Sequence, residues 1–158
     1  MHHKFNAEEI LEMAERIEKN GYDFYKKAAE DVKDEEIKRF LLDLAEMELK
    51  HEVSFQEMKA ALSSGEKADA VFDPDDEAAL YIQALADTRV FFEKKIDTSS
   101  VQEVLKEAII AEKESIVFYL GIRDMVPDNA GKAKINAIIK EEMSHIQIIS
   151  AKLLTVNK

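Results

Sequence analysis

Two motifs of the form Glu-x-x-His lie far apart in this sequence. They are Glu48-Leu49-Lys50-His51 and Glu142-Met143-Ser144-His145. A further glutamate precedes each motif by 30 residues, at Glu18 and Glu112. A shift of 94 residues superposes the two sets, and it also pairs Phe24-Tyr25 with Phe118-Tyr119. Four glutamates and two histidines at these spacings are typical ligands of a carboxylate-bridged pair of metal ions inside a four-helix bundle.

The residues around each motif predict that these glutamates and histidines are buried. Residues three or four apart share one face of a helix, and Glu48 and His51 continue an apolar stripe from Leu44 to Phe55. Burying an ionised carboxylate without a partner costs several kcal/mol. Four such groups in one core therefore require neutralisation, which two divalent cations would supply. Carboxylate and imidazole ligands suit iron or manganese, and they also bind zinc.

The spacing suggests a role for each candidate residue. Glu48 and Glu142 would bridge the two metals, Glu18 and Glu112 would be terminal ligands, and His51 and His145 would each bind one metal. Tyr25 and Tyr119 lie two helical turns beyond the terminal glutamates. They would either hydrogen-bond a ligand carboxylate or pack in the core with the hydroxyl at its rim. Four neighbouring glutamates are expected to face solvent: Glu46, Glu52, Glu114 and Glu141.

The elements that must position these residues are four long helices, expected at residues 7–31, 35–63, 101–125 and 128–154. Asn6 with Glu9, Asp34, and Ser100 with Glu103 are helix-start signals. Short connections make the first and last pairs hairpins, and residues 66–99 form a long crossover with one or two short helices, one of them starting at Asp73-Pro74. The sequence therefore predicts an all-α, ferritin-like, up-down-down-up four-helix bundle that forms a single domain over residues 1–158.

Composition excludes several other classes of protein. The chain has 158 residues, of which 46% are hydrophobic and 35% charged, with only four glycines and two prolines, which suits long helices. The absence of cysteine excludes disulfides and thiolate-held zinc or iron–sulfur sites. A net charge of −11 disfavours nucleic acid and anionic membranes as partners. No apolar run has the length of a membrane span or the pattern of a signal peptide, so we expect a cytoplasmic protein.

These residues together resemble the rubrerythrin branch of the ferritin-like superfamily. Residues 17–25 and their repeat at 111–119 are similar to ligand helices of that family, and the two Glu-x-x-His motifs match its second and fourth helices. The resemblance covers essentially the whole chain. It implies a di-iron centre that reacts with hydrogen peroxide or dioxygen, because rubrerythrins are typically peroxide reductases.

The chain departs from that family in two respects. Full-length rubrerythrins carry a four-cysteine rubredoxin domain, and this chain has no cysteine. The resemblance therefore implies an external electron donor, such as a rubredoxin-like protein. Peroxidase members also carry an extra carboxylate one turn after the ligand of the third helix, where this chain has Ser115.

Three functions follow from these residues. The first is a di-iron oxidoreductase that reduces peroxide or oxygen with external electrons. The second is a ferroxidase or metal-buffering protein without peroxidase turnover. The third is a structural bundle in which the buried glutamates and histidines pair with one another, so that no metal binds. A homodimer is a common assembly for such bundles.

Overall fold

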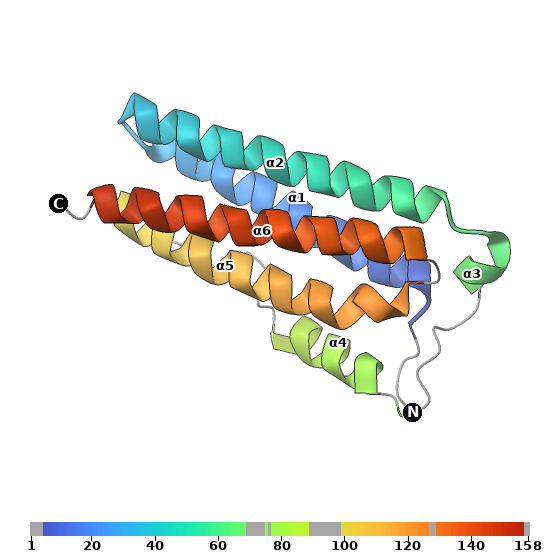
Figure 1. The fold of residues 1–158 in the computed structure, drawn as a ribbon. Coiled ribbons are helices and arrows are strands. Elements are labelled where there is room, and N and C mark those ends of the chain that lie inside the picture. Colours follow the sequence, from blue (N-terminus) through green and yellow to red (C-terminus); the bar gives the residue numbers. More distant parts are fainter. Residues whose placement is uncertain (1–4, 69–74, 76, 89–98, 127–128, 157–158) are drawn as a thin grey trace.

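The computed structural model describes residues 5–68, 75, 77–88, 99–126 and 129–156. Within these residues, four long helices form a bundle: α1 (Ala7–Asp31), α2 (Glu35–Ala60), α5 (Val101–Ile122) and α6 (Asn129–Val156). α1 and α6 run in one direction, and α2 and α5 run in the other (Figure 1). The predicted up-down-down-up, all-α bundle is therefore confirmed.

Side-chain caps fix where the first three of these helices begin. The Asn6 side chain accepts a hydrogen bond from the Glu9 amide (2.8 Å), and the Glu9 carboxylate accepts one from the Asn6 amide (3.0 Å). Asp34 accepts from two amides at the start of α2, and Ser100 accepts from Glu103 at the start of α5. These polar groups satisfy amides that have no partner within the helix.

Two helices end earlier than the sequence predicted. α2 ends at Ala60 rather than at Ser63, because Ser63 and Glu66 form a reciprocal capping pair that starts the short helix α3 (Ser64–Ala68). α5 ends at Ile122 rather than at residue 125, and a 3₁₀ turn, η1 (Arg123–Met125), follows it. Val126 is extended there, the conformation favoured for a residue that precedes proline.

The crossover between the hairpins contains α3 and a second short helix, α4 (Glu77–Thr88). α4 lies along α5 (Figure 1), where the Tyr81 hydroxyl donates a hydrogen bond to the Val117 carbonyl at 2.5 Å. Gly121 makes this approach possible, because a Cβ there would lie 2.2 Å from Cε1 of Tyr81. The predicted helix start at Asp73-Pro74 lies outside the described residues. None of the helices described here is long and apolar enough to cross a lipid bilayer.

The core consists of two apolar clusters with a polar layer between them. One cluster includes Leu41, Leu44, Leu105 and Ile149, and the other includes Phe55, Phe118, Ile122 and Ile135. Within each hairpin, α1 packs closely on α2 and α5 on α6, whereas the hairpins approach each other less closely across the seam between them. That wider seam leaves room for the polar layer.

Candidate metal centre

The polar layer contains all six residues that the sequence selected as metal ligands. The four helices contribute Glu18 (α1), Glu48 and His51 (α2), Glu112 (α5), and Glu142 and His145 (α6). Each is at most 3% exposed. The only other buried polar residue among the described ones is Ser115.

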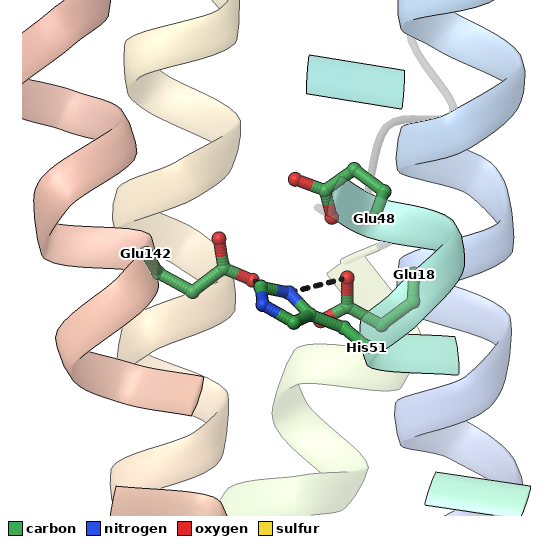
Figure 2. Close-up of side chains that lie close together, drawn as sticks. All are labelled: Glu18, Glu48, His51 and Glu142. Carbon is green, nitrogen blue, oxygen red and sulfur yellow. Dashed lines mark ion pairs between the residues drawn. The ribbon is translucent and has the colours of Figure 1, made fainter. Parts of the chain in front are cut away.

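The six side chains form two groups that share two glutamates. The first group is Glu18, Glu48, His51 and Glu142, and the second is Glu48, Glu112, Glu142 and His145. In each group, one candidate ligand atom per residue lies within 4.8 Å of the others. Figure 2 shows the first group, in which the side chain of Glu142 reaches from α6 toward residues of α1 and α2. Sharing of Glu48 and Glu142 is the arrangement required of bridging ligands.

The two imidazoles face the carboxylates through the same ring atom. Nδ1 of His51 lies 3.4 Å from Glu18 Oε2 and 3.3 Å from Glu142 Oε1. Nδ1 of His145 lies 2.9 Å from Glu142 Oε2 and 3.4 Å from Glu48 Oε1. The rings stack across the centre, with centroids 5.6 Å apart and planes inclined by 15°. Each Nδ1 is therefore placed to be a metal ligand.

The hydrogen bonding of these atoms tests whether the residues fit a metal pair. Buried polar atoms are normally hydrogen-bonded, yet several atoms of the centre have no hydrogen-bond partner: Glu18 Oε2, Glu48 Oε1, both carboxylate oxygens of Glu142, and Nδ1 of His51 and His145. The residues that carry these atoms all belong to the two groups of converging donors. Convergent oxygen and imidazole donors without partners are what a pair of divalent cations requires, so the residues fit.

The pKa values of the four buried glutamates are shifted in opposite directions. Burial, and then the charges of neighbouring glutamates, raise the pKa of Glu48 and Glu142 well above the ordinary value. Burial also acts to raise the pKa of Glu18 and Glu112, but the polar contacts and charges of neighbouring groups, including the histidines, outweigh it, and both values are lowered. Without metal, the two shared glutamates therefore hold a proton more readily than the other two.

Burial acts to lower the pKa of both histidines, but neighbouring carboxylates overcome it. Glu18 and Glu141 raise the pKa of His51 to about 9, and Glu112 and Glu142 raise that of His145 to about 9. Both imidazoles are therefore cationic at neutral pH when no metal is bound. A metal ion would displace these protons, because it binds the neutral ring.

The two predicted tyrosines contact the centre in a crossed pattern. Tyr25 of α1 donates a hydrogen bond to Glu112 Oε1 of α5 at 2.6 Å, and Tyr119 of α5 donates one to Glu18 Oε1 of α1. Burial and the adjacent glutamate charge raise the pKa of both hydroxyls well above the ordinary value. Both tyrosines therefore remain protonated donors that orient Glu112 and Glu18 across the seam.

Small residues occupy the helical turn after each terminal glutamate. Gly21 follows Glu18, and a Cβ there would lie 3.1 Å from Glu48 Oε2. Ser115, its counterpart in the repeat, is buried, and its hydroxyl donates to the Ala111 carbonyl at 3.0 Å. Neither side chain therefore adds a donor to the centre.

One residue near the centre, Glu141, was expected only to face solvent. Glu46 and Glu141 are exposed as expected, and Glu52 and Glu114 are half-buried. However, Oε2 of Glu141 lies 2.5 Å from Nε2 of His51. The internal repeat hid this contact, because a shift of 94 residues places Met47 opposite Glu141. The only available signal was its position directly before Glu142.

Comparisons with known proteins agree with this geometry. The rubrerythrin family model matches residues 9–153. A solved structure described as a putative ferritin-like diiron-carboxylate protein from Thermotoga maritima is similar, with 25% sequence identity, a TM-score of 0.70 and coverage of 96% of each chain. The comparison with curated proteins gave no match. The chain, with its paired carboxylate and histidine groups inside a ferritin-like bundle, belongs to the rubrerythrin family.

Proposed function

We propose that this protein is a di-iron oxidoreductase that reacts with hydrogen peroxide or dioxygen and takes electrons from an external donor such as a rubredoxin-like protein. The observation that carries the proposal is the pair of donor groups that share Glu48 and Glu142. The description of the Thermotoga maritima protein as a diiron-carboxylate protein supports iron as the metal.

Each residue has a definite part in this proposal. Glu48 and Glu142 would bridge the ions, while Glu18 with His51, and Glu112 with His145, would complete the two positions. Two ferrous ions bound there would supply the two electrons that reduce an O–O bond. Tyr25 and Tyr119 hold the terminal carboxylates by hydrogen bonds. The apolar clusters on either side exclude bulk water from the centre.

The proposal is tested by loading the protein anaerobically with two equivalents of ferrous iron. Hydrogen peroxide and dioxygen are then added separately, and oxidation is followed by stopped-flow absorption. We expect oxidation much faster than that of free ferrous iron under the same conditions, and repeated peroxide consumption when a reduced rubredoxin is supplied. Oxidation of the centre no faster than that of free iron by either oxidant would rule out the enzyme.

A second function, ferroxidase or metal buffering without peroxidase turnover, is favoured by Ser115. Where peroxidase members of the family would have an extra carboxylate, this chain has a buried hydroxyl that bonds to its own helix. The same experiment separates the two functions. A ferroxidase would oxidise iron with dioxygen and release or store the product, and peroxide would not be consumed repeatedly with the electron donor present. A buffering protein would bind two ions and accelerate neither reaction.

A further inference from the structure

The two metal positions differ in what lies behind their histidines. Nε2 of His51, on the far side of the ring from the ligand atom, lies 2.5 Å from Oε2 of Glu141. In the part of the chain that the structure describes, the ion-pair contacts of His145 are all made through Nδ1. The counterpart of Glu141 in the repeat is Met47, whose thioether carries no charge and accepts hydrogen bonds only weakly.

A carboxylate behind a metal-bound histidine has a known physical effect. It accepts the N–H of the second ring nitrogen, which fixes the tautomer and the ring orientation and makes the ligand nitrogen more basic. In His51, Nδ1 faces Glu18 and Glu142 while Nε2 faces Glu141. Glu141 therefore selects the tautomer in which Nδ1 is free to bind the ion.

Glu141 is separate from the ligand set itself. Its side chain is 62% exposed, and it belongs to neither group of converging donors. It precedes the fully buried Glu142 in the middle of α6. Its carboxylate therefore contacts the centre through the imidazole of His51.

We propose that Glu141 is a positioning residue that makes the metal position at His51 the tighter of the two, so that this position fills first. The proposal rests on the two-metal centre proposed above. It implies that the two metal positions differ in affinity, although the six ligand residues form two matching sets in the repeat.

The test uses cobalt(II) alone as the probe, added stepwise to the metal-free full chain under anaerobic conditions. Calorimetry and the visible cobalt spectrum give two binding constants. Anomalous scattering from crystals loaded with one equivalent shows which position is filled. For the unmodified chain we expect two distinct steps, with the first ion at His51.

Substitution of Glu141 isolates its contribution. Glu141→Ala is expected to weaken binding of the first cobalt ion by about 10- to 100-fold. At one equivalent of cobalt, the two metal positions should then be occupied more equally. Glu141→Gln keeps an oxygen that accepts the hydrogen bond, so it should recover part of the lost affinity and the cobalt spectrum of the first step. Because Glu141 is largely exposed, both variants should still fold.

Two further variants control for charge and test the reverse change. Glu46→Ala removes an exposed carboxylate of α2 that pairs with Lys50 rather than with a histidine, and it should leave both binding constants unchanged. Met47→Glu places a carboxylate at the position in the repeat that corresponds to Glu141. If it folds, it should tighten the weaker step.

The outcomes distinguish this inference from the proposed function. Equal filling of the two positions in the unmodified chain, or an effect of Glu141→Ala no larger than that of Glu46→Ala, would overturn the role of Glu141 and leave the two-metal centre intact. Failure of the unmodified chain to bind cobalt would overturn the metal centre and this inference with it.

Discussion

At the scale of single residues, the buried glutamates divide into two kinds. Glu48 and Glu142 belong to both donor groups, whereas Glu18 and Glu112 each belong to one. Their pKa values divide in the same way, raised for the shared pair and lowered for the other pair. The two kinds should therefore respond differently to the same substitution.

Glutamine substitution tests this division, because it preserves volume and removes the charge. Glu48→Gln removes a donor from both positions, so we expect it to abolish tight binding of both ions. Glu112→Gln removes a donor from one position only, so one ion should remain per chain, at His51. Metal analysis after gel filtration measures the number of ions bound per chain in each variant. Loss of the same number of ions in both variants would contradict the shared role of Glu48.

The crossed tyrosines give a second prediction at this scale. Tyr25→Phe leaves Glu112 without the hydrogen bond from the Tyr25 hydroxyl. A hydrogen bond to a charged group contributes about 1.5–3 kcal/mol, and we expect the free energy of unfolding of the metal-free protein to fall by about that amount. Tyr22→Phe, the same change one helical turn earlier, is the control and should have a much smaller effect. Urea unfolding compares the two, and equal changes would show that the contact with Glu112 contributes little.

The convergence of the six candidate ligands could be predicted from the sequence because helical periodicity determines which residues share a face. The same periodicity places Tyr25 and Tyr119 on these faces. It does not reveal that each tyrosine reaches across the seam to the glutamate of the other hairpin, because that depends on how the hairpins are aligned. The contact of Glu141 with His51 also crosses between the hairpins, and the repeat concealed it because the counterpart of Glu141 is Met47.

At the scale of elements, helix starts were easier to predict than helix ends. Asn6, Asp34 and Ser100 each cap a helix by a short-range hydrogen bond that is visible in the sequence. The end of α2 instead depends on the next helix, because Ser63 caps the start of α3 rather than continuing α2. The position of α4 depends on a distant contact between Tyr81 and α5.

The docking of α4 on α5 gives a prediction for Gly121. A Cβ at this position would overlap the ring of Tyr81, so Gly121→Ala should displace α4 and lower the free energy of unfolding by on the order of 1 kcal/mol or more. Gly65→Ala, in α3, is the matched control. It has no atom within 4 Å of the added Cβ and should be neutral or stabilising by up to about 1 kcal/mol.

A second substitution separates the steric overlap with Tyr81 from the higher helix propensity of alanine at residue 121. In a Tyr81→Ala background the added methyl group meets no ring, so Gly121→Ala should become neutral or stabilising there. Urea unfolding of the four chains measures the coupling. Additive effects of the two substitutions would mean that Tyr81 does not determine the need for glycine at residue 121.

At the scale of the whole molecule, stability should depend on pH in opposite ways with and without metal. The pKa of both histidines is about 9 in the folded protein, against an ordinary value of 6.5. Their contribution to stability is therefore fully present below pH 6.5 and is lost as pH rises through 9. The raised pKa values of Glu48 and Glu142 act in the same direction.

We therefore expect the free energy of unfolding of the metal-free protein to fall between pH 6.5 and 9. With excess Mn²⁺ this decline should disappear or reverse, because the ions bind deprotonated ligands and bind more tightly as pH rises. Urea unfolding in chelator and in Mn²⁺ across this range measures both curves. A metal-free protein whose stability rises with pH in this window would contradict the protonation pattern of the centre.

The sharing of Glu48 and Glu142 has a consequence for the internal repeat. The α1–α2 hairpin supplies three of the four residues in the group that includes His51, and Glu142 comes from the other hairpin. The α5–α6 hairpin likewise supplies three of the four residues in the group that includes His145, and Glu48 comes from the first hairpin. Each hairpin alone is thus one ligand short, and an identical hairpin facing it about a twofold axis would supply what is missing. The fold has the geometry of a self-complementary pair of hairpins fused into one polypeptide.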